Sequence, residues 1–328
     1  MAWTSTTSSL RTGRTPVQRR TRRVTSRAIE VAAPGKVNLI LRVLDRRPDG
    51  YHNLWSIMHA FELADTVVVE LNGRSGIRLT CEGADLPTDS TNLAYRAAER
   101  VLARIGRRKG LRLHLRKRLP VAAGLGGGSS NAASTIQALA VLLNTGWSRT
   151  EMAQLGQEVG SDVPFFFYGP TALVEGRGER VTPLRLEAER WLLLVHPGLA
   201  ISTAWAYERL AAGRAGQVGR VPGRLPHLAV AHHAEGPQLV KWHDLLPLVE
   251  NDFGPVMERE YPVLREIREL LLARDAQTAM LSGSGATVFG VFGEERSARI
   301  AAEGLDRRPG WKVWVTRTQW DPAPACLG

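Results

Sequence analysis

The sequence predicts an α+β fold. Strand-like segments follow one another at the start of the chain, and helical patterns come later, without the regular alternation of strand and helix seen in a doubly wound sheet. The chain has 328 residues, of which 44% are hydrophobic. It therefore exceeds the usual size of one compact domain, and we expect one large or two medium domains with a substantial core.

Strands are expected first. The segments 28–44, 54–63 and 66–71 are rich in β-branched residues and alternate in part, and the Gly and Pro of "RRPDGYH" separate the first from the others. A helix is expected over 91–105, where apolar residues recur at helical spacing. The segment 111–119, "LRLHLRKRL", alternates strictly and predicts a half-buried strand.

A glycine-rich segment follows this strand directly. The stretch "LPVAAGLGGGSSNAAS", residues 119–134, has four glycines within five positions. The next residues, from Ser129, form a good helix sequence. A further helix should begin at Ser148, which forms a capping box with Glu151, and end near Gly160.

The second half should begin with a buried strand at Trp191. Residues 213–238 are rich in Gly, Pro and His and predict a long surface loop. His232 and His233 in this loop could ligate a metal, but no third ligand has a suitable spacing, and solvated histidines are the favoured interpretation. The remaining expected elements are a helix over 256–274, the segment 278–292, a helix from about Glu294 and a strand over 311–316.

Composition excludes several classes of protein. No run of about 18 apolar residues occurs, so no membrane-spanning helix is expected. The two cysteines, Cys81 and Cys326, exclude a disulfide framework and a Cys-based metal site. This cysteine usage fits a reducing compartment, and we expect a cytoplasmic protein.

A basic tail precedes the expected fold. The formal net charge of +11 would suggest a nucleic-acid partner, but residues 1–29 carry seven arginines and no acidic residue, which leaves about +4 for the rest of the chain. Residues 1–27 fit a disordered extension, a transit peptide, which would imply a plastid, or a basic arm for nucleic acid or acidic lipid. We favour the disordered extension and expect no nucleic-acid partner.

The glycine segment is typical of a phosphate site. A helix N-terminus offers unpaired N–H groups and the positive end of the helix dipole, and glycine allows a ligand to come close. The Walker A pattern fails because Ser129 and Ser130 follow the glycines in place of a lysine, and the dinucleotide pattern fails because Ser129 occupies its third glycine position. The alternative is a glycine turn that only connects two elements.

The remaining pattern, P-x-x-x-G-L-G-G-G-S-S-N-A-A over 120–133, resembles the second signature motif of the GHMP kinase superfamily. "APGKVNL" at 33–39 resembles its first motif and "LSGSGATVF" at 281–289 its third, in the same order. The resemblance extends from Ala28 to about Thr318. It implies a two-domain GHMP kinase fold, with a ribosomal-protein-S5-like N-terminal domain over 28–190 and a ferredoxin-like C-terminal domain over 191–320.

Within this superfamily, "PDGYHNLWSIM" at 48–58, "GSDVPFFFYGPTALVEGRGE" at 160–179 and the Gly-Gly-Gly form of the loop resemble the 4-diphosphocytidyl-2-C-methyl-D-erythritol kinases of the non-mevalonate isoprenoid pathway. The resemblance implies transfer of the γ-phosphoryl group of ATP to the 2-hydroxyl of the methylerythritol unit. It also implies a small-molecule substrate in which cytidine is joined through a diphosphate, Mg²⁺ with ATP, and a monomer or homodimer. Homoserine or mevalonate kinase and a catalytically inactive binding protein remain alternatives.

The same resemblance implies roles for individual residues. Asp162 would be the general base, Lys36 would stabilise its carboxylate and the transferred phosphoryl group, and Asn38 would lie near the reacting hydroxyl. The ATP phosphates would be bound by the loop residues Pro120, Val121, Ala122, Ala123, Gly124, Leu125, Gly126, Gly127, Gly128, Ser129 and Ser130. Alternatively, Asp162 caps a turn or helix and Lys36 is solvated.

Substrate recognition is implied for four further residues. Tyr51 would stack on the cytosine, His52 would hydrogen-bond its edge, and Tyr207 would close the stack. Lys117 would lie near the substrate diphosphate, and the hydroxyl of Ser130 near Mg²⁺. A Tyr-His pair after a glycine turn also fits a hairpin end, and Lys117 also fits an outward position on an alternating strand.

Overall fold

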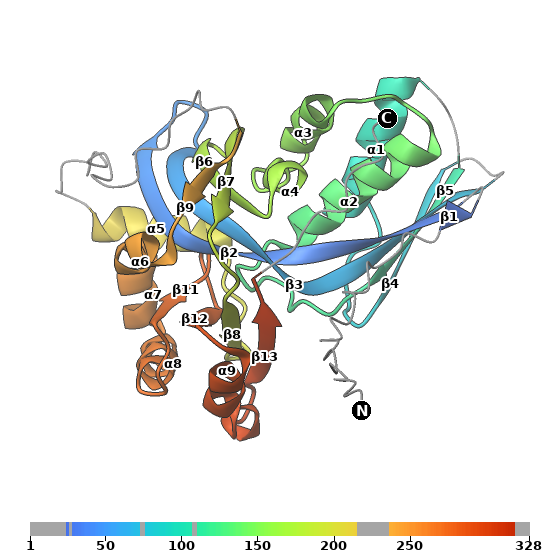
Figure 1. Cartoon of the computed structure of the whole chain (residues 1–328). Coiled ribbons are helices and arrows are strands. Elements are labelled where there is room, and N and C mark those ends of the chain that lie inside the picture. The colour runs from blue at the N-terminus through green and yellow to red at the C-terminus, as the bar shows by residue number, and fades with distance from the viewer. Residues whose placement is uncertain (1–23, 26–27, 73–75, 107–109, 215–235, 319–328) are drawn as a thin grey trace, which may run out of the picture.

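The computed structural model describes five segments of the chain, and in them it confirms the α+β class. Figure 1 shows helices packed on one face of a long, bent hairpin and a second, smaller sheet with its own helices on the other side. The described residues are 24–25, 28–72, 76–106, 110–214 and 236–318. Most of the basic tail, Cys326, and residues 215–235 of the loop predicted over 213–238, with His232 and His233, lie outside these segments.

The hairpin of β2 (Ala28–Arg46) and β3 (His52–Asn72) organises the larger sheet. The sequence predicted two strands within β3, and this was wrong. Antiparallel pairing with β2 is irregular between Ala60 and Ala64 but resumes at Ala64 and Asp65, so the segment is one strand with a bulge. The preceding β1 (Val24–Thr25) pairs antiparallel with β2. These two residues of the expected disordered tail therefore belong to the sheet.

Nine strands join this sheet among the described residues. The strand predicted over 111–119 is β5 (Gly110–Arg116), and it ends before the chain turns toward the glycine segment. Besides β1, the sequence analysis missed five members of the sheet. These are β4 (Ile77–Glu82), β6 (Thr171–Gly176), β7 (Arg180–Leu186), β9 (Gln238–Val240) and β10 (Glu250–Asn251).

Four helices cover one face of the hairpin (Figure 1). They are α1 (Leu93–Ile105), α2 (Gly127–Leu142), α3 (Arg149–Gln157) and the short α4 (Phe165–Tyr168). The predicted capping box is confirmed: Ser148 Oγ accepts from Glu151 N at 3.2 Å, and Glu151 Oε2 accepts from Ser148 N at 2.8 Å. The first turn of α3 is thus satisfied locally, which is why its start could be predicted.

The second sheet has the strand order β11-β12-β8-β13, with all neighbours antiparallel. Along the chain, β8 is followed by helices, then β11, β12, a helix and β13, which is the ferredoxin-like βαββαβ arrangement that was expected. The strands are β8 (Trp191–His196), β11 (Thr278–Leu281), β12 (Val288–Phe292) and β13 (Lys312–Arg317). The helices and 3₁₀ turns are α5 (Thr203–Gly213), α6 (Trp242–Leu245), η1 (Leu246–Leu248), α7 (Gly254–Glu260), α8 (Pro262–Leu272), α9 (Glu295–Ala302) and η2 (Leu305–Arg307).

The predicted single helix over 256–274 is in fact two helices. The break falls at Tyr261, whose φ of −132° and ψ of 86° are not helical. Pro262 follows it, and a proline both lacks an N–H and disfavours the helical conformation of the residue before it. The interruption therefore has a local cause that the apolar periodicity concealed.

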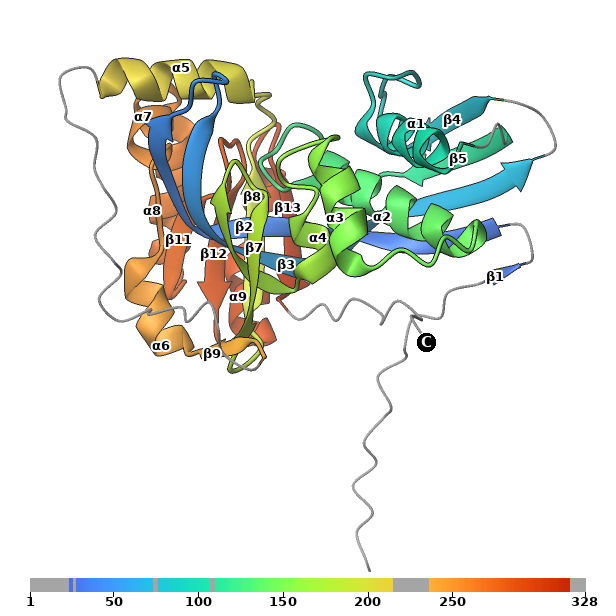
Figure 2. The ribbon, with the colours of Figure 1, turned by 90° about the horizontal axis from the view of Figure 1, so that it is seen from above.

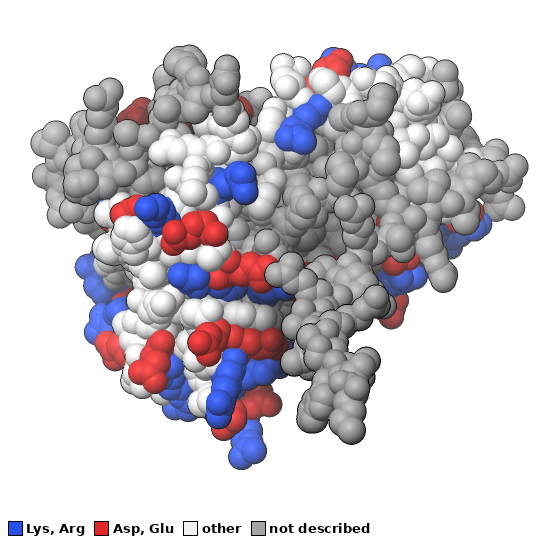
Figure 3. All heavy atoms as spheres, in the orientation of Figure 1, with Lys and Arg blue, Asp and Glu red and all other residues white. Residues whose placement is uncertain are grey.

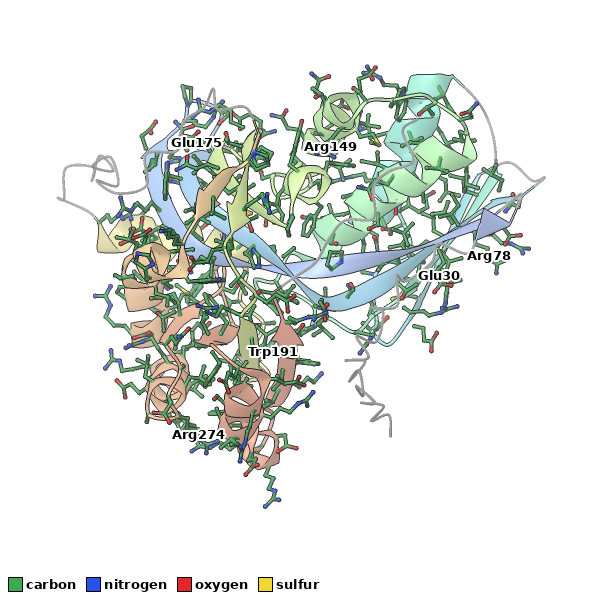
Figure 4. The ribbon with its side chains drawn as sticks, in the orientation of Figure 1. Glu30, Arg78, Arg149, Glu175, Trp191 and Arg274 are labelled. Atoms are coloured by element: carbon green, nitrogen blue, oxygen red, sulfur yellow. The ribbon has the colours of Figure 1, made fainter. Side chains whose placement is uncertain are left out.

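The two sheets are packed together and linked by hydrogen bonds. Thr316 Oγ1 accepts from Leu63 N at 2.9 Å, and Arg317 forms an ion pair with Glu62. Seen from above, the second sheet with its helices lies beside the helices α1 to α4 along the hairpin (Figure 2). The boundary predicted between 190 and 191 coincides with the start of β8, where Figure 4 labels Trp191. However, β9 and β10 pair back onto β7 and β2, so the sheets do not follow that division strictly.

The surface around the second sheet and its helices carries charges of both signs. Figure 3 shows basic and acidic side chains mixed on the viewed face below the hairpin. Several form pairs, such as Arg268 with Glu258 and Arg299 with Glu295. Within the described segments, no helix has the length and apolar content needed to cross a membrane.

His59 of β3 should make the stability of the fold depend on pH. Its Nδ1 lies 2.6 Å from Thr171 Oγ1, and burial lowers its pKa from 6.5 to about 4. The pKa of His59 is lower in the folded than in the unfolded protein, so the neutral imidazole favours folding. This stabilisation is complete above pH 6.5 and is lost as pH falls toward 4. Between pH 7.5 and 5, His59 should account for about 2 kcal/mol of the decrease in unfolding free energy.

The measurement is urea unfolding of the wild type and of His59→Gln at both pH values. The variant should lack this part of the decrease, so the stability difference between the two proteins should shrink at pH 5. His243→Gln, at a side chain that is 70% exposed, is the control and should behave as the wild type. Equal pH dependence of the wild type and His59→Gln would contradict the prediction.

Candidate active site

A pocket of about 550 Å³ lies where the three sequence motifs meet. Its wall brings together residues that are far apart in the sequence, from the first motif, the glycine turn, the α3–α4 turn, the start of α5 and the third motif. The lining includes Lys36, Asn38, Lys117, Pro120, Val121, Ala122, Ala123, Gly124, Leu125, Gly126, Gly127, Gly128, Ser129, Asn131, Asp162, Thr203, Tyr207 and Ser284. Of the loop residues predicted to bind ATP, all but Ser130 line the pocket.

The three residues predicted to be catalytic lie together. Lys36 Nζ is 3.3 Å from Asp162 Oδ2 and donates a hydrogen bond to Asn38 Oδ1 at 2.6 Å. The Lys36 side chain is only 4% exposed, whereas that of Asp162 is 29% exposed. The ammonium group is therefore held by two acceptors, and the carboxylate retains an open side toward the pocket.

Asn38 is itself held by a chain of buried hydrogen bonds. Its Nδ2 donates to Ser56 Oγ at 2.9 Å, and Ser56 Oγ donates to the carbonyl of Ile40 at 2.7 Å. These contacts direct the amide oxygen of Asn38 at Lys36. The sequence analysis missed Ser56, whose one signal was a hydroxyl between the apolar residues Trp55 and Ile57.

Asp162 lies in the turn between α3 and α4. The residues after it anchor the turn in the core: Val163, Phe165, Phe166 and Phe167 are all at most 4% exposed. The sequence predicted that this apolar run would place Asp162 at the edge of a packed wall, and the burial agrees. A rigid wall behind the carboxylate limits the positions that it can adopt.

The glycine segment forms the predicted strand–turn–helix connection, and its helix begins two residues earlier than expected, at Gly127. Gly126 precedes the helix with a φ of +69°. A Cβ at this position would lie 2.8 Å from Lys36 Cγ, so glycine is needed for the lysine stem to pass. The first turn of α2 has no side-chain cap, and its N–H groups are available to an anionic ligand.

The third motif supports the glycine turn from behind. Ser282 Oγ donates to the carbonyl of Gly124 at 3.0 Å, and Thr287 N donates to that of Ala123 at 3.3 Å. Asn251 of β10 in turn donates to the carbonyls of Leu281 and Gly283, both at 2.8 Å. Because β10 pairs with β2, this buried asparagine connects the third motif to the strand that carries the first. No sequence pattern identified Asn251.

Lys117 is buried under the start of α2 and does not point outward from the strand. Its ammonium forms an ion pair with Asp65, whose side chain is 0% exposed, and donates to Asn131 Oδ1 at 3.0 Å. Lys117 also lines the pocket. Its predicted place near the substrate diphosphate stays a prediction, and Asp65 is a partner that sequence reasoning missed.

The predicted aromatic residues lie at the hairpin end of the site. The rings of His52 and Tyr207 are stacked, with centroids 4.8 Å apart, and Phe253 packs edge-on against Tyr207. Tyr51 is 53% exposed, and the guanidinium carbon of Arg177 lies 4.5 Å from its ring centroid. In this structure Tyr207 thus contacts His52, and the ring contacts of the described residues do not pair it with Tyr51.

Burial sets the protonation of both stacked rings. It lowers the pKa of His52, and the positive charges of Arg46 and Arg214 act in the same direction. It also raises the pKa of Tyr207, with a further contribution from the Asp162 carboxylate. At neutral pH the imidazole therefore offers one donor and one acceptor, and the phenol keeps its proton.

Comparison with known proteins assigns the chain. Residues 92–170 match the GHMP kinases N terminal domain, and residues 239–310 match the GHMP kinases C terminal model. A protein of Geobacter sp. (strain M21) called 4-diphosphocytidyl-2-C-methyl-D-erythritol kinase is 37% identical over 88% of this chain and 99% of its own length. One of Geobacter metallireducens with the same name is 39% identical over 89% and 99%. This chain belongs to the 4-diphosphocytidyl-2-C-methyl-D-erythritol kinase family.

Solved structures agree with this family assignment. A crystal structure of 4-(cytidine 5'-diphospho)-2C-methyl-D-erythritol kinase has a TM-score of 0.70 and 34% identity, and the match covers 89% of this chain and all of that one. Homoserine kinase from Cytophaga hutchinsonii has a TM-score of 0.65 at 18% identity, with 89% and 96% covered. The second likeness shows the shared fold alone.

The donor set of this kinase site fits an ion that is held mainly by phosphate. Among the described residues, no cluster of three or more His, Cys, Asp and Glu side chains could hold a metal. Asp162 is the single carboxylate among the lining residues. Ser130 Oγ, predicted near Mg²⁺, is buried and has no hydrogen-bond partner among the residues that the structure describes. Mg²⁺ commonly binds through one or two protein groups plus substrate phosphates, and these residues suit that mode.

Proposed function

We propose that this protein transfers the γ-phosphoryl group of ATP to the 2-hydroxyl of 4-diphosphocytidyl-2-C-methyl-D-erythritol, giving the 2-phosphate and ADP. The observation that carries the proposal is the Lys36–Asp162 pair, which faces the same pocket as the open N-terminus of α2. A proton acceptor and a phosphate cradle in one cavity are the two requirements of phosphoryl transfer to an alcohol. Membership of the family supports the choice of substrate.

The chain's residues would divide the work as follows. The N–H groups at the start of α2 bind the ATP phosphates, and the glycines let those phosphates approach the backbone. The substrate hydroxyl lies beside Asp162, which accepts its proton as the oxygen attacks. Lys36, held by Asp162 and Asn38, offsets negative charge on the phosphoryl group during its transfer. The general base should contribute about 10²–10⁴ in rate.

Mg²⁺ bound with ATP would neutralise negative charge on the phosphates and so favour attack by the substrate hydroxyl. We propose that the hydroxyl of Ser130 lies near the ion. The unpartnered hydroxyl of Ser130 supports this, because a buried polar atom requires a partner.

The cytosine would be recognised at the hairpin end of the pocket. The stacked rings of His52 and Tyr207 and the exposed ring of Tyr51 offer flat surfaces to a base. A neutral His52 can pair with the base edge through one nitrogen. Binding of the base would insert it among these rings, with Lys117 toward the diphosphate. A cytoplasmic location and a monomeric or homodimeric state stay predictions.

The test is ADP formation by the purified full chain with ATP and Mg²⁺. Turnover is expected with 4-diphosphocytidyl-2-C-methyl-D-erythritol, and the product should carry phosphate at the 2-hydroxyl by ³¹P NMR. Homoserine and mevalonate are the control acceptors, because neither has a base to stack. Turnover with homoserine or mevalonate, and none with the cytidyl compound, would contradict the proposal.

A further inference from the structure

A cluster of three buried polar side chains, Asp65, Lys117 and Asn131, lies under the glycine turn, and the mechanism above does not use Asp65. We propose that Asp65 is a positioning residue for the ATP-phosphate site. It ties the chain entering the glycine turn to the helix leaving it and orients Lys117 between them. The inference rests on the proposed kinase function and adds to it a residue that does not touch substrate.

Asp65 is a charged group whose two oxygens are fully committed. Oδ1 accepts from Arg118 N at 2.8 Å and Leu119 N at 2.9 Å. Oδ2 accepts from Asn131 Nδ2 at 3.0 Å and pairs with the Lys117 ammonium. A carboxylate that is 0% exposed is tolerated only with such partners. All four donors come from the two ends of the glycine turn.

The cluster lies close to the first residue of α2, at the proposed phosphate site. A Cβ built on Gly127, the first residue of α2, would lie 3.4 Å from Lys117 Nζ and 3.6 Å from Asp65 Oδ2. Lys117 has three N–H donors, of which Asp65 and Asn131 take two. The third remains for the pocket that Lys117 lines. Asp65 thereby determines both where α2 begins and where this ammonium points.

A shift of the turn should affect ATP more than the cytidyl substrate. The phosphates contact backbone N–H groups at the start of α2, and a displacement of about 1 Å at such a site can reduce activity by about 10²-fold. The base-binding rings are carried by other elements, His52 at the start of β3 and Tyr207 on α5. Loss of Asp65 should therefore separate the two substrates kinetically.

The experiment is Asp65→Asn in the full chain. The amide keeps one oxygen for the N–H groups of Arg118 and Leu119, but it can place an NH₂ group toward Lys117 and Asn131, where both partners need an acceptor. We expect the KM for ATP and the Kd for ADP, measured by calorimetry, to rise about tenfold or more. The KM for the cytidyl substrate should rise by a smaller factor, because that substrate would lose only the contact of its diphosphate with Lys117.

Ile267→Ala, in the apolar face of α8 and away from the pocket, is the matched destabilised control. It should lower the melting temperature and leave both KM values near those of the wild type. If Asp65→Asn does not fold, Asp65→Glu retains the charge and displaces the carboxylate, and it should show the same selective loss for ATP. An unchanged ADP affinity, or equal changes in both KM values, would overturn the proposal.

The ADP calorimetry separates this inference from the proposed substrate. If the wild type binds ADP but does not phosphorylate the cytidyl compound, the substrate proposal fails, and the ADP affinity of Asp65→Asn still tests the positioning role.

Discussion

Replacement of Asp162 by Asn should lower kcat by about 10²–10⁴-fold. The amide has nearly the same shape but cannot accept the proton of the attacking hydroxyl. At 1.36 kcal/mol for each factor of ten, the loss corresponds to about 3–5 kcal/mol of barrier. The Kd for ATP should change little, because the phosphates are bound by the turn before α2, and Lys36 keeps its hydrogen bond to Asn38.

Steady-state kinetics and ATP binding on the same preparation measure this effect. Asp244→Asn is the matched control, because Asp244 lies on α6, outside the pocket lining. It should retain the kcat of the wild type. A wild-type kcat in Asp162→Asn would remove the base assignment, and a parallel loss of ATP binding would indicate a disturbed pocket.

Gly124→Ala should disrupt the phosphate site through a backbone collision. Gly124 has a φ of +76°, and an added Cβ would lie 2.0 Å from the carbonyl oxygen of Ser282. The atoms that the Cβ would meet belong to the backbone and cannot rotate away, so the glycine turn or the third motif must move. We expect the KM for ATP to rise at least about tenfold and the unfolding free energy to fall by more than the 1–2 kcal/mol that a left-handed conformation alone costs.

Gly146→Ala provides the comparison for this prediction. Gly146 has a similar φ of +67°, but an added Cβ would meet nothing within 4 Å. The loss of unfolding free energy in Gly146→Ala measures the cost of a left-handed alanine without a steric collision. The KM of this variant for ATP should not change. The contact with Ser282 would be unimportant if the two variants lost equal stability and bound ATP equally well.

Elements with a local cause could be predicted from the sequence. The capping box identified a helix start because its two partners, Ser148 and Glu151, are three residues apart. The alternation after Leu111 identified a strand because its side chains alternate between buried and more exposed positions. The strands β6 and β7 were missed, since their pairing with β3 and with each other is not visible in local pattern. The helix expected over 256–274 is broken at Pro262. The proline is a local signal, but the prediction gave more weight to the helical spacing of the apolar residues.

The candidate site divides in the same way. Motifs that resemble those of the superfamily were sufficient to propose Lys36, Asn38, Asp162 and the glycine turn as site residues, because each motif is a contiguous pattern. Asp65 and Asn251 could be found only in the folded chain. Their partners are up to 66 residues away for Asp65 and 32 residues away for Asn251, and an isolated Asp or Asn gives no sign of what it will contact. Long-range packing joins the three motifs, and with them the proposed site residues, into one pocket.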